Sequence, residues 1–291
     1  MAIDYHKLKN WNFPVLEHSY TEKDSMLYAL GVGVGAEPTC AGQLQFVYEP
    51  ELKTLPCMAV IMAHPGLWMG HPETGVDLLK VVHGEQKLQL HRPLPVAGCV
   101  TGHSRVIAVV DKGRDKGALL VVQREIRDKQ SGELLATAEQ TSFCRGDGGF
   151  SEHGQLSDAA PASDNSPLPD RSPDLICDLP TRPEGALIYR LSADRNPLHA
   201  DPETARQAGF PAPILHGLAT YGVACHALLR ACCDYRPERL RSLATRFSAP
   251  VFPGETIRTE IWRDGGHVRF QSRVLERAKL VLSNGSAQVS D

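Results

Sequence analysis

A run of alternating apolar and polar residues, then a turn rich in Pro and Gly, then a second run, occurs once in each half of this 291-residue chain. In the first half the two runs cover residues 85–94 and 100–110, and in the second half they cover 240–249 and 256–262. Alternation of this kind is typical of strands that bury one face. The chain is therefore expected to form antiparallel sheet twice, from segments of similar design.

Further alternating runs follow in each half. They cover 118–126 and 134–144 in the first half, and 268–275 and 279–289 in the second. Short turn signals near these runs predict hairpins between successive strands. These signals are Lys112-Gly113, Ser131-Gly132, Asp264-Gly265-Gly266 and Asn284-Gly285.

A helix is expected ahead of each set of strands. In the second half it covers residues 217–233, where apolar residues recur at three- and four-residue spacing between Pro213 and Pro237. The segment carries little charge before Arg230, which favours a helix enclosed by other elements. The simplest architecture is α+β, with an antiparallel sheet curled around a buried helix, occurring twice. Two unrelated α+β domains are the alternative.

The segment 146–174 differs from the rest in composition. It is rich in Gly, Ser, Asp and Pro and has few branched apolar residues, so it cannot bury enough apolar surface to offset its ordering entropy. We therefore expect a flexible linker at 146–174. It would separate an N-terminal domain, residues 1–145, from a C-terminal domain, residues 175–291, both of ordinary domain size.

Charge and targeting signals exclude several classes of partner. The formal net charge of −3 gives no reason to expect nucleic acid or an anionic membrane as a partner. The first residues lack the basic and apolar stretches of a secretory signal, and no run of about 18 apolar residues occurs. We expect a cytoplasmic protein.

The eight cysteines and twelve histidines show no metal-binding spacing. No Cys-x-x-Cys pair and no His-Glu-x-x-His motif is present. The cysteines are expected to act as small buried hydrophobic residues, and no metal ion is expected.

The densest polar cluster is Tyr189 to Pro202, just before the predicted helix. Two prolines and an Asp-Arg-Asn-Pro turn would hold Asp194 and His199 near one another. A carboxylate and an imidazole can share one water molecule and move protons in both directions. The structural alternative is that Asp194 caps a turn while His199 only packs beside it.

The start of the predicted helix is a second candidate, at His216 and Gly217. Backbone N–H groups at a helix N-terminus stabilise a developing oxyanion, and a glycine allows a carbonyl group to approach closely. An ordinary glycine at a helix start is the alternative. The glycines at 31–35 do not have the spacing of a phosphate loop, and no Gly-x-Ser-x-Gly nucleophile motif occurs.

Residues 192–199, Ser-Ala-Asp-Arg-Asn-Pro-Leu-His, closely resemble the hydratase 2 motif Ser-Gly-Asp-x-Asn-Pro-Leu-His. That motif marks MaoC-like (R)-specific 2-enoyl-CoA hydratases and the hydratase domain of peroxisomal multifunctional enzyme type 2. Similar segments extend over most of the chain outside the linker, so the resemblance is to the form with two repeats. They are residues 27–33, 83–86, 214–222 and 246–254.

The resemblance implies a double hot-dog fold, with two curled antiparallel sheets each around a long helix. It implies Asp194 and His199 as the catalytic pair, Asn196 as a supporting residue, and the Gly217 N–H as the group that binds the thioester oxygen. Glu85 and His216 are expected as substrate-binding residues, although a buried structural role for Glu85 is the alternative.

The same resemblance implies that the C-terminal repeat is catalytic and that the N-terminal repeat makes room for the acyl chain. The expected reaction is reversible (R)-specific hydration of a trans-2-enoyl-CoA, with no cofactor beyond the CoA of the substrate, in a homodimer. A hot-dog thioesterase, a non-catalytic acyl-CoA binding protein and a hydratase for a specialised acyl group remain alternatives. Ala193 stands where the family usually has Gly, which would matter if that position required a positive φ.

Overall fold

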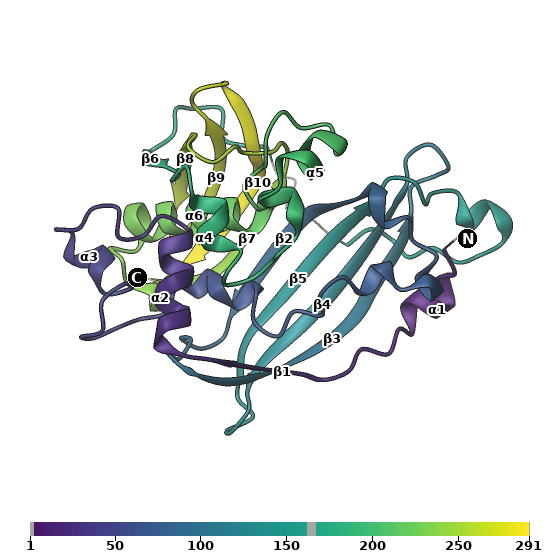
Figure 1. Ribbon diagram of the computed structural model, residues 1–291, viewed down its shortest axis with the longest axis horizontal. Helices are drawn as coiled ribbons and strands as arrows, with labels where there is room; N and C mark the ends of the chain where they lie inside the picture. Colours follow the sequence, from purple (N-terminus) through teal and green to yellow (C-terminus); the bar gives the residue numbers. More distant parts are fainter. Residues whose placement is uncertain (1–2, 162–166, 291) are drawn as a thin grey trace.

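The computed structural model describes residues 3–161 and 167–290, and its main element is a ten-stranded sheet (Figure 1). The strand order is β1-β3-β4-β5-β2-β7-β10-β9-β8-β6, and neighbouring strands are antiparallel. The strands are β1 (Leu16–Tyr20), β2 (Val81–Leu90), β3 (Gly98–Asp111), β4 (Ala118–Asp128), β5 (Leu134–Cys144), β6 (Leu175–Pro180), β7 (Leu240–Phe247), β8 (Thr256–Asp264), β9 (His267–Val274) and β10 (Lys279–Val289).

Each of the eight predicted runs overlaps a strand, although the runs 85–94, 240–249 and 268–275 extend beyond the ends of β2, β7 and β9, and one predicted turn is wrong. Asn284 and Gly285 lie inside β10, where the pairing with β7 and β9 shifts register. Asn284 has a φ of 51°, which is the conformation that makes an Asn-Gly pair suit a bulge as well as a turn. The turn between β9 and β10 lies instead at residues 275–278. The edge strands β1 and β6 were not predicted from the sequence.

The expectation of two separate sheets is corrected by the pairing of β2 with β7. These strands lie side by side in the middle of the sheet, from Glu85 opposite Arg246 to Gln89 opposite Ser242. The sheet therefore runs continuously from one half of the chain into the other. An exposed strand edge leaves backbone N–H and C=O groups unpaired, and this pairing removes one such edge from each half.

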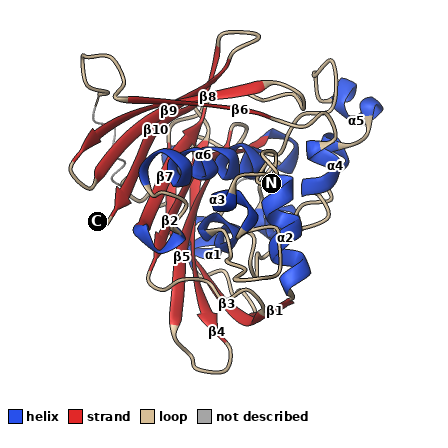
Figure 2. Ribbon diagram, turned by 90° about the vertical axis from the view of Figure 1, so that its left-hand side faces the viewer, coloured by secondary structure: helices blue, strands red, loops and turns tan. Residues whose placement is uncertain are grey.

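The α-helices lie on the concave side of the curved sheet, as Figure 2 shows for α2, α3 and α6. The longest is α6, a 16-residue helix that is buried over most of its length, and the end strands β8 and β6 curl over it. It corresponds to the helix predicted at 217–233. The α-helices are α1 (Tyr5–Lys9), α2 (Glu22–Gly31), α3 (Ala41–Leu44), α4 (Gly185–Tyr189), α5 (Pro202–Gln207) and α6 (Gly217–Cys232).

The N-terminal half differs from the prediction because no helix comparable to α6 is present among its described residues. The segment ahead of β2 contains the four-residue helix α3 and a series of 3-10 helices. Pro50 and Pro56 interrupt this segment, and a proline inside a helix removes a hydrogen bond and clashes with the preceding turn. The 3-10 helices of the chain are Pro56–Val60, Trp68–Gly70, Pro72–Thr74, Leu78–Lys80, Phe150–His153, Pro197–His199 and Pro237–Arg239.

The largest hydrophobic core cluster contains side chains of both halves. It contains Tyr28 of α2, Tyr189 of α4 and Tyr221 of α6, all fully buried. Helix α6 approaches the N-terminal half so closely that a Cβ added to Gly222 would lie 2.5 Å from Val32 Cγ1. A glycine is therefore required at this crossing.

The first part of the predicted linker is fixed to the N-terminal half by hydrogen bonds. Asp158 accepts hydrogen bonds from the Tyr5 hydroxyl at 2.8 Å, the Lys9 ammonium group at 2.7 Å and the Val109 N–H at 2.9 Å. Phe150 is buried among apolar side chains of the same half. Composition did not reveal this anchoring because it depends on polar contacts with distant residues. Residues 162–166 lie outside the described part of the chain.

Each of the eight cysteines is a free thiol, and six of them are buried, as expected for small hydrophobic residues. Among the described residues, no helix has the length and apolar character needed to cross a bilayer.

Candidate active site

The loop between α4 and α5 places Asp194 and His199 at the start of α6. Asp194 Oδ1 accepts a hydrogen bond from the Asn196 N–H at 2.9 Å, and Asn196 Oδ1 accepts one from the Leu198 N–H at 3.0 Å. Asn196 caps the 3-10 helix Pro197–His199 in this way. The Asp-x-Asn-Pro sequence thus builds two successive turns that fix the separation of Asp194 and His199. Asp194 is exposed, whereas His199 is buried.

The tautomer of His199 follows from its partner. Its Nδ1 lies 2.8 Å from the carbonyl oxygen of Ile214, which can only accept, so Nδ1 carries the proton. The lone pair is therefore on Nε2. Burial lowers the pKa of His199, and the hydrogen bond to Ile214 and the charge of Asp194 oppose this shift only in part. A neutral imidazole with an unprotonated Nε2 is the form that can accept a proton.

His216 connects the start of α6 to the same loop. Its Nε2 donates a hydrogen bond to the backbone carbonyl of Asp194 at 2.9 Å, and its ring stacks on that of His199 with centroids 3.7 Å apart. The side chain is 3% exposed. Burial, followed by the neighbouring His199, lowers the pKa of His216 to about 4. His216 is thus neutral, and it positions both members of the pair.

Gly217 is the first residue of α6, with His216 as N-cap. The hydrogen bonds of the helix begin with the N–H groups of Ala219 and Thr220, which both donate to the His216 carbonyl. The N–H of Gly217 precedes this pattern, at the positive end of the helix dipole. A Cβ at Gly217 would meet the Phe247 ring at an ordinary 3.5 Å, so internal packing does not require a glycine at this position.

Asp194, His199 and His216 also have the composition of a metal site. One potential ligand atom of each lies within 4.8 Å of the others, although no metal spacing was recognised in the sequence. However, His199 Nδ1 and His216 Nε2 are already hydrogen-bonded to carbonyl oxygens. A metal ion would therefore have to use the opposite ring nitrogens.

Side chains of the N-terminal half that sequence analysis did not single out face the same region. The charge of Asp194 acts on the pKa of His64, which burial and then the nearby Arg124 lower to about 4. His83 packs edge-on against Phe247, beside Gly217, with ring centroids 4.7 Å apart. Arg124 had a recognisable signal, since it interrupts the apolar alternating residues of β4. His64 had none, because it lies in an irregular segment.

Glu85 lies on β2, opposite Thr141 of β5 and Arg246 of β7. Its side chain is half-buried, and it makes no hydrogen bond or ion pair to Asp194 or His199 within the described residues. The structure thus brings Asp194, Asn196, His199, His216 and Gly217 together and places Glu85 on the sheet that faces them. Its role as a substrate-binding residue stays a prediction.

Ala193 does not have a positive φ, so the loop has no left-handed residue at this position. The replacement of the usual Gly by Ala therefore introduces no backbone strain here.

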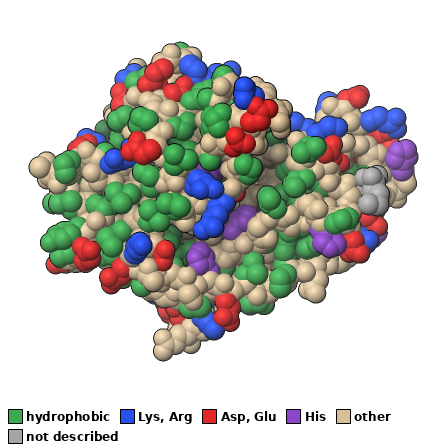
Figure 3. Space-filling view, in the orientation of Figure 1, with side chains coloured by type: hydrophobic (Ala, Val, Ile, Leu, Met, Phe, Trp, Pro, Cys, Tyr) green, Lys and Arg blue, Asp and Glu red, His purple; other side chains and the backbone are tan. Residues whose placement is uncertain are grey.

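On the face seen in Figure 3, a group of Lys and Arg side chains lies beside His side chains at the margin of a hollow near the centre of the molecule.

Two family models match the chain, one in each half. Residues 18–146 match the N-terminal domain of the hydratase 2 unit of multifunctional enzyme type 2, and residues 164–284 match the MaoC-like domain. The chain is 41% identical to 3-hydroxyacyl-thioester dehydratase Y of Mycobacterium tuberculosis over 99% of both proteins. It is 38% identical to the peroxisomal enoyl-CoA hydratase 2 of Arabidopsis thaliana, over 93% of this chain and 90% of that protein.

Solved structures agree with these matches. A MaoC-like dehydratase from Phytophthora capsici superimposes with a TM-score of 0.85 at 33% identity, covering 98% of both chains. A Mycobacterium tuberculosis protein described as a double hot-dog fold superimposes with a TM-score of 0.56 at 13% identity, covering 98% of both chains. The continuous sheet with α6 in its concavity is therefore a double hot-dog arrangement.

Proposed function

The chain belongs to the hydratase 2 family of MaoC-like enzymes, and on that premise we propose that Asp194 and His199 jointly activate water for (R)-specific hydration of trans-2-enoyl-CoA thioesters. The reaction class is that of hydro-lyases, which both the hydratase and the dehydratase names of the relatives describe. The observation that carries the residue assignment is the tautomer of His199. Its hydrogen bond to Ile214 leaves Nε2 free to accept a proton beside the Asp194 carboxylate.

The proposed reaction begins with the substrate carbonyl oxygen at the N–H of Gly217. The hydrogen bond and the helix dipole draw electrons toward this oxygen, so C3 becomes electrophilic and the enolate-like charge is stabilised. A water molecule held between Asp194 and His199 delivers hydroxide to C3. The proton removed from that water reaches C2 on the same face, and the product is the (3R)-hydroxyacyl-CoA. Dehydration is the same sequence in reverse.

The two halves have different roles in this proposal. Residues 175–291 carry the catalytic pair and the oxyanion-binding helix, whereas residues 1–145 accommodate the acyl chain. The two halves differ in the way this division requires, because the N-terminal half has no helix comparable to α6 among its described residues. The separate family matches on either side of residues 147–163 support it too.

The test is turnover of a panel of trans-2-enoyl-CoA thioesters, followed through loss of the enoyl absorbance and by chiral analysis of the product. We expect hydration with the (3R) product in large excess. A (3S) product, or no loss of enoyl absorbance with any chain length, would contradict the proposal. Release of free thiol measured in parallel separates hydration from thioester hydrolysis, which is the alternative reaction.

The proposed chemistry requires no metal ion and no cofactor other than the CoA of the substrate. Prolonged incubation with EDTA should leave kcat unchanged. Added Zn²⁺ that bound the Asp194, His199 and His216 group would inhibit rather than activate, since it would occupy the position of the water. Loss of activity with EDTA and recovery with a metal ion would contradict this.

The cytoplasmic location and the homodimer also stay proposals. The Arabidopsis relative is named as peroxisomal, so microscopy of a tagged protein in its host cell is the appropriate test of location. Sedimentation equilibrium tests the dimer, which would have twice the chain mass of 31.8 kDa.

A further inference from the structure

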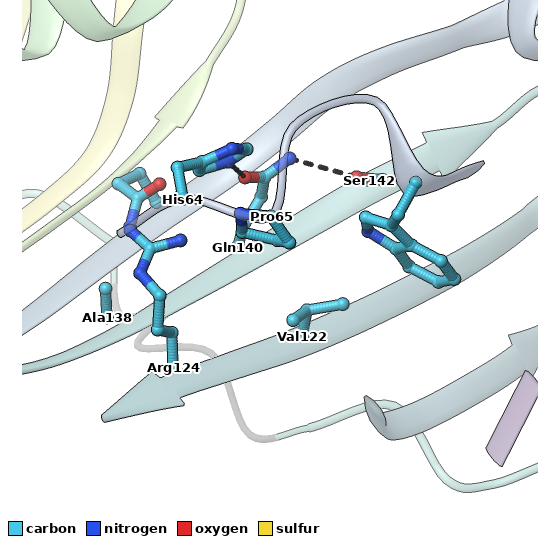
Figure 4. Close-up of a pocket in the computed structure, with 9 residues that line it drawn as sticks. His64, Pro65, Val122, Arg124, Ala138, Gln140 and Ser142 are labelled. Atoms are coloured by element: carbon cyan, nitrogen blue, oxygen red, sulfur yellow. Dashed lines mark hydrogen bonds between the residues drawn. The ribbon is translucent and has the colours of Figure 1, made fainter. Parts of the chain in front are cut away.

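A cavity of about 480 Å³ lies where β2 ends and its neighbour β7 begins. Its walls come from residues 52–56 and 90–96 of the N-terminal half and from residues 237–241 of the C-terminal half. This volume falls in the range of small-molecule sites. The pocket beside Arg124, shown in Figure 4, has only about 10 Å³, which is room for about one water molecule, so it is too small for an organic ligand.

The cavity is separate from the candidate active site. None of the residues assigned to that site lines it. Phe247, which packs beside Gly217, ends β7, whereas Leu240 begins this strand and lines the cavity. With a rise of about 3.3 Å per residue, the eight-residue strand places its two ends roughly 20 Å apart. A ligand in the cavity would therefore lie far from the catalytic pair.

The walls of the cavity are mainly apolar. Several of the residues are prolines, which have no N–H group to offer a ligand. Thr54 is the uncharged polar residue of the lining, and its hydroxyl already donates to the Pro95 carbonyl at 2.8 Å. Such walls suit an aliphatic chain. The apolar lining residues are Leu52, Pro56, Leu90, Pro93, Leu94, Pro95, Val96, Pro237 and Leu240.

Hydrogen bonds from distant elements fix the turn that forms one wall. Besides the bond from Thr54, the Pro95 carbonyl accepts one from the Tyr20 hydroxyl at 2.9 Å. The Val96 carbonyl accepts one from the Ser25 hydroxyl at 2.7 Å. A wall that is fixed before the ligand arrives loses less conformational freedom on binding, so the cavity is preorganised.

Basic side chains outnumber acidic ones around the cavity. Its charged lining residues are Lys53, Arg92, Arg241 and Glu238. Arg92 forms an exposed ion pair with Glu133 at 3.6 Å, a type of contact that contributes little. Within the described residues, the side chains of Lys53 and Arg241 make no hydrogen bond or ion pair. Both are therefore available to an anion.

We propose that this cavity is a second ligand site, which binds a free fatty acid with its aliphatic chain along the apolar walls and its carboxylate at Lys53 and Arg241. Ammonium and guanidinium groups form charge-assisted hydrogen bonds with a carboxylate. A ligand that is polar over its whole length fits poorly, because apolar walls do not replace its hydration. The inference goes beyond the proposed hydration and does not depend on it.

The experiment titrates the whole chain with saturated fatty acids from octanoate to palmitate, below their micelle concentrations, by isothermal titration calorimetry. Each titration is repeated with saturating decanoyl-CoA, which occupies the proposed active site and cannot be hydrated because it lacks a double bond. We expect saturable binding with the same Kd in both titrations. Decanol, which has the chain without the charge, should bind at least about 10-fold more weakly than decanoate, the usual size of a hydrogen bond to a charged group.

Variants test the charges and the space separately. The double variant Lys53→Met/Arg241→Met removes both charges and should raise the Kd of decanoate by at least about 10-fold. The control Lys112→Met/Lys116→Met removes the same charge from the exposed turn between β3 and β4 and should leave the Kd unchanged. Val96→Trp keeps the charges and fills the cavity, so it should abolish binding.

The outcomes separate this inference from the proposed function. Displacement of decanoate by decanoyl-CoA would place the acid in the active site and overturn the inference. An unchanged Kd in Lys53→Met/Arg241→Met, or equal affinity for decanol and decanoate, overturns it as well. So does a wild-type protein that binds no acid of the series. None of these results bears on the proposed hydration, because binding is measured without turnover.

Discussion

The two halves of the chain form similar sheets and fill their concave faces differently. In the C-terminal half, α6 runs unbroken for 16 residues beneath the sheet, and its N-terminus meets the loop that carries Asp194 and His199. In the N-terminal half, the corresponding region holds short helical segments and a pocket that contains Arg124. In the proposed function the N-terminus of α6 supplies the oxyanion site, whereas the interrupted segment of the N-terminal half contributes its side chains to the core. We therefore propose the chemistry for the C-terminal half, and the acyl-chain role of the N-terminal half stays a prediction.

The strongest test of this difference removes the catalytic groups from the C-terminal half. Asp194→Asn and His199→Gln should each lower kcat by at least about 100-fold, because general acid–base catalysis contributes effects of this size. Steady-state kinetics with one enoyl-CoA measures the loss, and circular dichroism verifies the fold.

The matched controls are Asp201→Asn, an exposed acid that caps α5 in the same loop, and His103→Gln on β3. Both should retain nearly full kcat. Near-full activity in Asp194→Asn and His199→Gln would contradict the assignment of the catalytic pair. A large loss of kcat in His103→Gln would indicate a catalytic role for the N-terminal half, contrary to the proposal.

The pH dependence of the reaction should reflect the environment of His199. Its pKa lies below the ordinary 6.5 because burial disfavours the charged form. The neutral form is needed as the base, so kcat/KM should be constant from neutral pH down to about 6.5 and fall by about 10-fold per pH unit below the pKa of His199. A pH–rate profile of the wild-type enzyme measures this. An acid limb centred above 6.5 would contradict the expected direction.

Contact between the halves can be tested at Gly222. A Cβ there would lie 2.5 Å from Val32 Cγ1, so Gly222→Ala should destabilise the protein by about 1–3 kcal/mol despite the better helix propensity of alanine. Adding Val32→Ala should recover part of this loss. Denaturant unfolding measures both.

Gly185→Ala in α4 is the control, since the nearest atoms to its Cβ would be 3.9 Å away. It should be neutral or stabilise by up to about 1 kcal/mol. Equal effects of the two glycine substitutions would show that α6 and Val32 are not in close contact.

The smallest expected effect is that of Ala193→Gly, which restores the usual family residue. Ala193 does not have a positive φ, so Gly relieves no strain and should lower stability by less than about 1 kcal/mol through the greater entropy of the unfolded chain. Activity should change less than about 2-fold, within the usual effect of a surface substitution. A large gain in kcat would indicate that Ala193 displaces Asp194.

The local parts of the fold were predictable from sequence, and the long-range parts were not. Alternation located eight of the ten strands, and the Asp-x-Asn-Pro turn located Asp194 and His199. Both signals come from residues that are neighbours in the sequence. The pairing of β2 with β7 left no trace in either segment. Asn284-Gly285 suits a bulge as well as a hairpin, since both use a positive φ.

The candidate site shows the same limit. His216 and Gly217 were found because they adjoin the predicted helix. His64 was missed because it reaches the site from a segment without periodicity, and Arg124 because a single charge in an alternating strand is usually assigned to the solvent side. The anchoring of Asp158 was missed for a related reason. Its three partners lie far away in the sequence.

The pairing of β2 with β7 has a consequence for how the protein unfolds. Because the ladder crosses the middle of the sheet and the tyrosines of both halves share one interior, neither half can lose its structure without exposing the other. Heating should therefore produce a single cooperative transition rather than two. A gene fragment that encodes only one half should therefore yield an insoluble product without hydratase activity.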